Sequence, residues 1–172
     1  MIDEIIIYFL LPLIGTLAYG ALKFAPWVPC FNQDLPRIFK HAKLNPNKVF
    51  YDLGSGTGKT LFYANKNFNS YAKGIEVAIP FYVYSKIKQL ISGNKKIQIK
   101  FGDFYKNDIS DADVVYLYGM NNTLHKKLQD KLQKELKKGA KVISYAFPFT
   151  NWKHKIKDKP SKKHTAIYVY EV

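Results

Sequence analysis

Strand and helix patterns alternate along most of this 172-residue chain, and this alternation restricts its possible folds more than any other feature. Short apolar or alternating runs predict strands, whereas apolar residues repeated every three to four positions predict helices. The predicted strands cover 48–53, 70–77, 96–101, 113–118, 141–147 and 165–172, and the predicted helices cover 32–43, 59–68, 80–92 and 122–138. We therefore expect an α/β, Rossmann-like fold in which a mostly parallel sheet carries helices on both faces.

The clearest helix pattern lies at 122–138, where leucines recur every four residues between charged ones. Such a stripe is typical of a helix that packs on the core with one face. Gly139 follows the last predicted turn, and we expect it to cap the helix because glycine is common just after a helix end. Residues 152–163 contain many lysines and one proline, so we expect a loop there.

A glycine-rich stretch, DLGSGTGKT, begins at Asp52 and follows the strand predicted at 48–53. A phosphate-binding loop needs a glycine five residues before its Gly-Lys-Thr ending, and Leu53 occupies that position. A dinucleotide-binding loop needs G-x-G-x-x-G, whereas residues 54–58 read G-x-G-x-G. The charge of Asp52 would repel a pyrophosphate, but it suits a ligand with an amino group and a sulfonium, such as S-adenosylmethionine.

Acidic residues stand at the ends of successive predicted strands, in an arrangement that fits the same ligand. Asp52 and Glu76 end two strands, and Asp103 follows the next one. A carboxylate at Glu76 can accept both ribose hydroxyls, and one at Asp103 can accept the adenine amino group. A single acid at a strand end often only caps the next helix, but three in order predict an S-adenosylmethionine-dependent methyltransferase. The cofactor-binding residues predicted at the strand ends are Asp52, Gly54, Ser55, Gly56, Glu76, Val77, Gly102, Asp103, Phe104 and Tyr118.

Six segments resemble a family of small class I protein-lysine methyltransferases, which includes the enzymes that methylate the c-subunit of ATP synthase and the adenine nucleotide translocase. The segments read FAPWVP, VFYDLGSGTG, GIEV, GDFYKNDISDADVVYLY, KLQKELKKGAKVIS and FPFTNW, in the order of the family. The resemblance covers residues 24–172 and implies the class I methyltransferase fold with a lysine acceptor on a protein. It also implies that Trp27, Val28 and Pro29 fold over the cofactor.

The chain departs from the family pattern at three positions near the glycine-rich loop. Thr57 stands where the family usually has an acid, and Lys59 stands where arginine is common. Cys30 stands where threonine is frequent. We expect these differences to change details of affinity rather than activity.

Methyl transfer is an in-line displacement, and alignment of the acceptor can supply much of its acceleration. A lysine acceptor must first lose a proton from a reference pKa of about 10.4, and an apolar mouth favours the neutral amine. The predicted catalytic residues are the aromatic side chains of Tyr118, Phe147 and Trp152 and the amide of Asn121. Further candidates for the wall of an acceptor channel are Tyr116, Tyr145 and Pro148. For each aromatic alone core packing is the commoner role, and only their grouping at the strand ends favours the acceptor channel.

Residues 5–22 form an uncharged segment, IIIYFLLPLIGTLAYGAL. As a helix it would be about 27 Å long, close to the roughly 30 Å hydrocarbon core of a bilayer. Acidic residues precede it and basic residues follow it, which by the positive-inside tendency places the rest of the chain in the cytoplasm. We expect residues 1–23 to be a transmembrane or membrane-anchor helix outside a methyltransferase domain at 24–172. A cleaved signal peptide and a buried core helix are the alternatives.

The net charge of +14 would suit an acidic partner such as nucleic acid or anionic lipid. Among the 27 basic residues, however, only Arg37 is an arginine, the residue that most often reads bases and phosphates. We therefore interpret the charge as background composition and a solvated surface rather than as a nucleic-acid site, with attraction to anionic lipid or an acidic protein as the alternative. The protein substrate is what the family resemblance implies. The single Cys30 excludes an internal disulfide, and the scattered histidines indicate no metal site. Methylation of RNA or of a small molecule, and membrane-tethered cofactor binding without turnover, remain the alternative functions.

Overall fold

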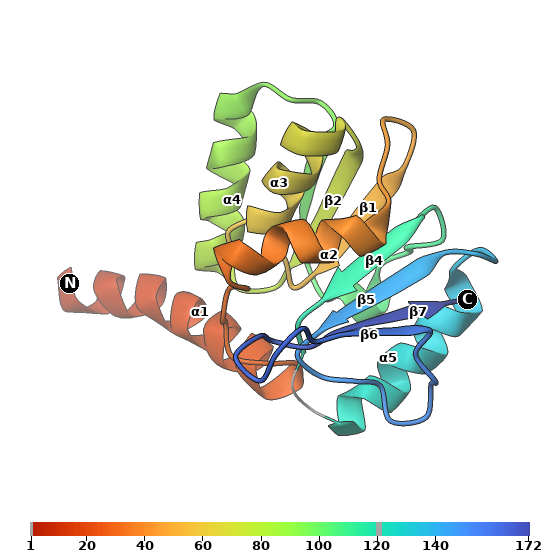
Figure 1. Cartoon of the computed structure of the whole chain (residues 1–172). Helices are drawn as coiled ribbons and strands as arrows, with labels where there is room; N and C mark the ends of the chain where they lie inside the picture. Colours follow the sequence, from red (N-terminus) through yellow and green to blue (C-terminus); the bar gives the residue numbers. More distant parts are fainter. Residues whose placement is uncertain (1, 120–121) are drawn as a thin grey trace.

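Seven strands form the sheet at the centre of the fold (Figure 1). The computed structural model describes residues 2–119 and 122–172, with all of their side chains except those of 2–6, 9, 23 and 122–126. The strands are β1 (Val49–Leu53), β2 (Tyr71–Glu76), β3 (Ile97–Phe101), β4 (Val114–Leu117), β5 (Lys141–Tyr145), β6 (Ile156–Asp158) and β7 (Ile167–Glu171). Their order across the sheet is β3-β2-β1-β4-β5-β7-β6. β1 to β5 are parallel, and β7 pairs antiparallel with both β5 and β6.

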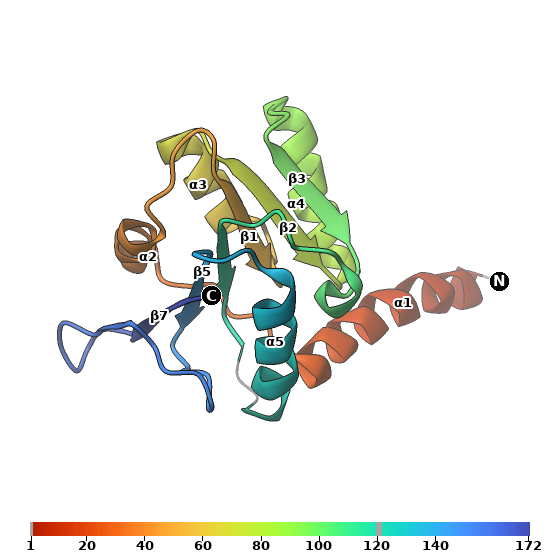
Figure 2. The same ribbon diagram turned by 90° about the vertical axis from the view of Figure 1, so that its right-hand side faces the viewer.

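Helices cover both faces of the sheet, as Figures 1 and 2 show. The helices α2 (Leu35–Ala42), α3 (Lys59–Phe68) and α4 (Ile79–Ser92) lie on one face, and α5 (Asn122–Glu135) lies on the other. Phe50 of β1 belongs to the buried cluster that includes α2 and α3. Leu53 of the same strand belongs to the cluster that includes α5. Burial on both faces explains why β1 reads as a nearly continuous apolar run.

The strand order reverses between β1 and β4, which are neighbours in the sheet. From β1 the chain moves outward through β2 and β3, then returns to place β4 on the other side of β1. In open α/β sheets a ligand binds outside the carboxyl ends of the strands at such a reversal. The ends of β1, β2 and β4 therefore define the place where a site is expected.

The stretch between β4 and β5 differs from its prediction. The helix predicted over 122–138 ends at Glu135, so the prediction that Gly139 caps it is wrong. The backbone N–H of Gly139 instead donates to the carbonyl of Val172 at 2.7 Å. The described leucines of the stripe are buried as expected: Leu128, Leu132 and Leu136.

The lysine-rich stretch 152–163 contains a short strand, β6, and the prediction of a plain loop there is wrong. β6 pairs with β7 from Ile156 opposite Val169 to Asp158 opposite Ile167. On the side away from β5, the backbone N–H and C=O groups of β7 need hydrogen-bond partners. A segment without an apolar strand pattern can supply them, and β6 does so.

The N-terminal helix α1 (Ile2–Lys23) projects from the body of the fold at its start and crosses the carboxyl edge of the sheet at its end (Figures 1 and 2). Among the residues whose structure is described, none of the helices is long and apolar enough to cross a membrane. The expectation that this segment lies outside the domain is wrong for its last turns, because the Ile79 N–H donates to the Thr16 hydroxyl at 3.1 Å. The short 3₁₀ turns η1 (Asn32–Asp34) and η2 (Phe104–Lys106) complete the described elements.

Candidate active site

The glycine-rich loop after β1 is tied to the end of β2 through its backbone. The N–H groups of Gly54 and Ser55 donate to the carbonyl of Ile75 at 3.0 and 3.1 Å. Gly56 has φ 53°, and a Cβ atom at this position would lie 2.4 Å from Nε1 of Trp27. Only glycine therefore lets the indole of Trp27 lie directly on the loop.

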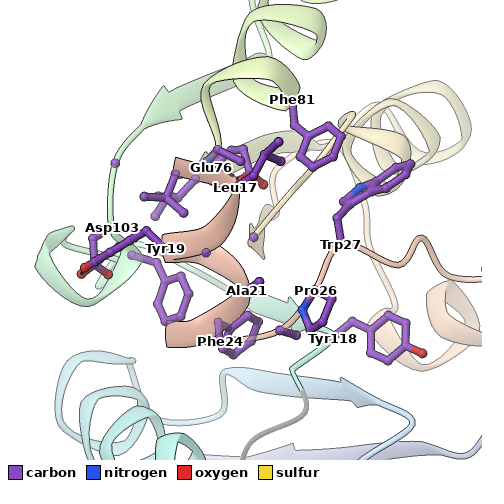
Figure 3. A pocket seen from close by; sticks show the side chains of 18 of the residues that line it. Leu17, Tyr19, Ala21, Phe24, Pro26, Trp27, Glu76, Phe81, Asp103 and Tyr118 are labelled. Atoms are coloured by element: carbon purple, nitrogen blue, oxygen red, sulfur yellow. Dashed lines mark hydrogen bonds between the residues drawn. The ribbon is translucent and has the colours of Figure 1, made fainter. Parts of the chain in front are cut away.

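Glu76, at the end of β2, is held by the backbone on both sides. Its Oε2 accepts the N–H of Gly56 at 2.6 Å, and its Oε1 accepts the N–H of Ala78 at 2.8 Å. Burial raises the pKa of this carboxyl, and the hydrogen bonds from Ala78 and Gly56 oppose the rise. The carboxylate is thus fixed in one orientation at the edge of the sheet, where it faces the pocket (Figure 3).

Asp52, the second acid of the loop region, is nearly completely buried and accepts a hydrogen bond from the hydroxyl of Thr60. Burial raises the pKa of Asp52 to about 8, the Thr60 hydrogen bond opposes this rise, and the charge of Glu76 adds to it. A buried acid with a raised pKa is a group whose charge a cationic ligand would stabilise. Thr60 is the second residue of α3, so the start of this helix holds the acid rather than a phosphate.

Asp103 follows β3 and is held by contacts on each of its oxygens. Its Oδ1 accepts the N–H of Tyr105 at 2.8 Å. Its Oδ2 accepts the hydroxyl of Tyr19, from α1, at 3.4 Å. Phe104 is buried beside it and packs edge-on against Phe24 with ring centres 5.0 Å apart.

Two adjoining pockets run along these strand ends. The first lies between α1 and the ends of β2 and β3, and Glu76 and Asp103 line it (Figure 3). The second lies between the glycine-rich loop and β4, and Asp52 and Lys59 line it. Both pockets are lined by the same four residues at their junction: Trp27, Val28, Gly54 and Tyr118. The site is therefore elongated, with separate acidic groups along its length.

Residues 17–30, here called the cover, close the open side of these pockets. Trp27 stacks on Phe81 of α4 with ring centres 4.6 Å apart. Phe24 lies against Gly119 so closely that a Cβ there would come within 2.3 Å of its ring. Lys59 donates a hydrogen bond to the carbonyl of Cys30, which fastens the far end of the cover to α3.

Comparison with known proteins identifies the fold and its cofactor. The family described as ANTKMT methyltransferase domain matches residues 52–156. The chain belongs to this family. A protein-lysine N-methyltransferase of Saccharolobus islandicus (strain REY15A) is 31% identical over a 156-residue alignment that covers 86% of this chain and 93% of that protein. The human lysine N-methyltransferase of the ATP synthase c-subunit is 26% identical over 129 residues, 74% of this chain and 54% of that protein.

Solved structures agree with the family. An RNA methyltransferase from Salinibacter ruber, in complex with S-adenosyl-L-homocysteine, has a TM-score of 0.78 and 26% identity, covering 84% of this chain and 93% of that one. A methyltransferase from Thiobacillus denitrificans, with the same ligand, has a TM-score of 0.59 and 19% identity, covering 69% and 49%. The predicted class I methyltransferase fold is confirmed, and the chain is a methyltransferase that uses S-adenosylmethionine.

The site of this ANTKMT-family methyltransferase fits that cofactor in its chemistry. The hydroxyl of Ser55 is buried and has no hydrogen-bond partner among the described residues, and Ser55 lines the second pocket. Asp52 and Glu76 offer acceptors for an amino group and for hydroxyls, whereas phosphate would meet two acids. The aromatic rings of Trp27, Phe81 and Phe104 provide flat apolar surface for a base.

Most of the predicted cofactor-binding residues of the methyltransferase come together here. Those that line one or both pockets are Trp27, Val28, Pro29, Asp52, Gly54, Ser55, Glu76, Val77, Gly102, Asp103, Phe104 and Tyr118. Gly56 lies beneath Trp27 and binds Glu76. Thr57, Lys59 and Cys30, the three departures from the family pattern, all line the second pocket.

The predicted acceptor residues, in contrast, are only partly brought together. Tyr118 lies edge-on to Tyr145, with ring centres 4.8 Å apart, and faces Phe147 at 6.4 Å. Trp152 packs instead with Phe149 and Tyr170 in the cluster that includes α5. The sequence does not reveal this difference, because β5 ends at Tyr145 and the following loop turns Trp152 towards the other face of the sheet. Asn121 lies outside the described residues.

Several residues of the site were not predicted from the sequence. The prediction omitted pocket-lining residues of α1, the cover and α4: Leu17, Tyr19, Gly20, Ala21, Phe24 and Phe81. The apolar pattern of α1 gave no sign of them, since it fits a membrane segment equally well. For Thr60 a signal existed, because a hydroxyl in the first turn of α3, eight residues after Asp52, can reach back to a strand-end acid.

Proposed function

We propose that this methyltransferase transfers methyl groups to lysine side chains of a protein. The carrying observation is that Tyr118 lines both pockets and lies beside Phe147, so an aromatic opening adjoins the junction of the cofactor site. The Saccharolobus and human relatives, both named as lysine N-methyltransferases, support a lysine acceptor.

The proposed roles of the acids follow from their positions along the site. Asp103 accepts the adenine amino group, and Glu76 accepts the ribose hydroxyls. Asp52 binds the amino group of the methionine part, and Lys59 in the same pocket binds its carboxylate. Along the site the order is Asp103, Glu76, and then Asp52 with Lys59. This order matches adenine, ribose and the charged end of the methionine part along the cofactor.

The chemistry requires a neutral amine aligned with the methyl group. When bound, the cofactor supplies an electrophilic methyl group on its sulfonium. The rings of Tyr118 and Phe147 exclude water from the acceptor, which lowers the pKa of a lysine amine and favours its reactive form. The same rings restrict its approach to one direction, and such alignment can supply much of the rate acceleration.

Methylation of RNA is the second candidate, because the Salinibacter neighbour carries that description. Methylation at carbon-5 of a pyrimidine needs a cysteine thiolate as nucleophile. Cys30 does line the second pocket, but burial raises the pKa of its thiol and disfavours the thiolate. The scarcity of arginine also favours protein over RNA as the acceptor.

We further propose that α1 associates this methyltransferase with a membrane, and that its substrate is a membrane-associated protein. The outer part of the helix carries large apolar side chains that are exposed: Ile7, Tyr8, Leu10, Leu11 and Ile14. A run of such residues on one projecting helix is typical of a surface that contacts lipid or another apolar partner. The domain would then lie on the cytoplasmic side, as the charge asymmetry predicts.

The substrate class is tested by incubating the purified full chain with tritiated S-adenosylmethionine and with membrane and soluble fractions of the source cell. We expect label on lysines of membrane-fraction proteins, located by mass spectrometry, and no label with Glu76→Gln. Label in RNA rather than protein would overturn the lysine proposal. Cofactor binding without label in any fraction would support the inactive alternative.

Membrane association is tested by flotation of the full chain with lipid vesicles. The double variant Leu11→Lys/Ile14→Lys is expected to stay at the bottom of the gradient while the wild type floats. Leu90→Lys/Ile91→Lys is the matched control, because these α4 residues are also apolar and exposed. Equal flotation of all three proteins would contradict a specific role for α1.

A further inference from the structure

The last turns of α1 form one wall of the pocket that contains Glu76 and Asp103 (Figure 3). Leu17, Tyr19 and Ala21 line this pocket from the helix, opposite the strand ends. An apolar N-terminal helix thus contributes directly to the proposed adenosine end of the cofactor site.

Specific contacts seat this part of the helix. The Thr16 hydroxyl accepts the N–H of Ile79 at 3.1 Å, which anchors the helix to the start of α4. Gly20 allows a close approach to the residue that follows β2, since a Cβ there would lie 3.2 Å from Cγ1 of Val77. These contacts place Tyr19 over the end of β3, where its side chain remains 41% exposed.

Tyr19 is the side chain of α1 that reaches a polar group of the pocket. Its hydroxyl donates to Oδ2 of Asp103 at 3.4 Å, while the Tyr105 N–H holds Oδ1 at 2.8 Å. One donor on each oxygen restricts rotation of the carboxylate. Each carboxylate oxygen has two acceptor positions, so Asp103 can still accept a ligand amino group.

We infer that Tyr19 is a positioning residue for adenine recognition: it orients Asp103 so that the carboxylate accepts the 6-amino group of the cofactor. This inference rests on the proposed assignment of Asp103 to adenine. It makes α1 a working part of the cofactor site in addition to any role at a membrane.

The test compares Tyr19→Phe with Tyr8→Phe in the full chain, by calorimetric titration with S-adenosylhomocysteine. Tyr8 is the matched control, because it is on the same helix and 76% exposed. Removing one hydrogen bond to a charged group should weaken binding about fivefold in Tyr19→Phe. Tyr8→Phe should bind as the wild type does. Unchanged or tighter binding by Tyr19→Phe would overturn the inference.

A second ligand separates positioning from simple packing. S-inosylhomocysteine has a 6-oxo group in place of the 6-amino group, and the wild type should bind it more weakly than S-adenosylhomocysteine. In Tyr19→Phe this preference should shrink, because a misplaced Asp103 discriminates less between the two groups. Equal weakening of both ligands would show that Tyr19 only packs, and would overturn the inference. Failure of the wild type to bind S-adenosylhomocysteine would overturn the proposed function itself.

Discussion

The two sides of the cofactor pocket are held together by different kinds of interaction. On the strand side, backbone groups bind one another: the Gly102 N–H donates to the carbonyl of Glu76 at 2.9 Å, and Glu76 in turn binds the Gly56 N–H. On the cover, side chains reach partners that are distant in the sequence, as Trp27 does on Phe81. One side is therefore built from strand pairing and a tight loop, and the other from tertiary contacts between side chains.

This difference suggests a division of roles. The strand side carries the acids, so it determines which ligand is bound. The cover is mostly apolar and adds contact area and exclusion of water, so it determines how tightly the ligand is held. Substitutions at the junction of the two sides should change the affinity for the cofactor most, and substitutions outside both sides should change it least.

Among substitutions in the glycine-rich loop and the cover, Gly56→Ala should cause the largest loss of affinity, because this position joins the two sides. The added Cβ would overlap the indole of Trp27 and displace the cover from the loop. We expect binding of S-adenosylhomocysteine to weaken by at least about 30-fold, roughly 2 kcal/mol, in a calorimetric titration. Gly93→Ala is the matched control, since Gly93 also has positive φ but nothing within 4 Å of its Cβ position. Equal losses in both variants would show that backbone strain alone is responsible.

Asp52 should make cofactor binding depend on pH. The carboxyl keeps its proton up to about pH 8 in the free protein, whereas the amino group of the ligand favours the ionised form. Binding therefore releases a proton, and affinity should rise up to about tenfold per pH unit between pH 6 and 7. Asp52→Asn should bind more weakly, and its affinity should not change over this range. An equally steep pH dependence in the variant would exclude Asp52 as its source.

The same raised pKa predicts the sign of a stability change. Between the ordinary pKa of an aspartate and about pH 8, the folded protein holds a proton that the unfolded chain releases. The contribution of Asp52 to stability therefore falls as pH rises through this window. Asp52→Asn should reduce the decline of Tm between pH 5 and 8, measured by thermal unfolding without ligand.

Lys59→Met should have a moderate effect that is confined to the second pocket. It removes the charge proposed for the cofactor carboxylate and the hydrogen bond to the Cys30 carbonyl, while keeping the length of the side chain. We expect about fivefold weaker binding of S-adenosylhomocysteine. Binding of adenosine alone should not change, and weaker adenosine binding would show that the substitution disturbs the whole cover.

Trp152→Ala should have the smallest effect on cofactor affinity, although it removes a large aromatic side chain. Trp152 packs on Phe149 and Tyr170 away from both pockets, so its loss should lower the Tm and leave the affinity unchanged. Trp27→Ala should weaken cofactor binding and leave the Tm nearly unchanged, because Trp27 lines both pockets. A rise in the KM for the protein substrate with Trp152→Ala, at unchanged Tm, would restore its predicted role in the acceptor channel.

The strand side could be predicted from sequence because its information is local. The turn at residues 54–58 is contiguous, and each acid stands at the end of a recognisable strand. The position of a strand end in a parallel sheet follows from topology alone, so the sequence predicts that Asp52, Glu76 and Asp103 lie at the same edge of the sheet.

The cover could be predicted only in part. The resemblance to a family placed Trp27 over the cofactor, but no pattern indicated Tyr19 or Phe24. Their positions depend on close approaches, such as Phe24 against Gly119, that join segments far apart in the chain. β6 was not predicted for a similar reason. Its pairing depends on the open edge of β7 rather than on a strand pattern in its own sequence.

The central claim, that the strand-end acids hold S-adenosylmethionine, is tested most directly by calorimetric titration of the full chain with S-adenosylhomocysteine. The wild type should bind one ligand per chain, and Glu76→Gln should bind at least about 30-fold more weakly, because an amide cannot replace two carboxylate acceptors. Glu171→Gln, at an acid outside the site, should bind as the wild type does. Absence of binding by the wild type, or equal binding by Glu76→Gln, would contradict the claim.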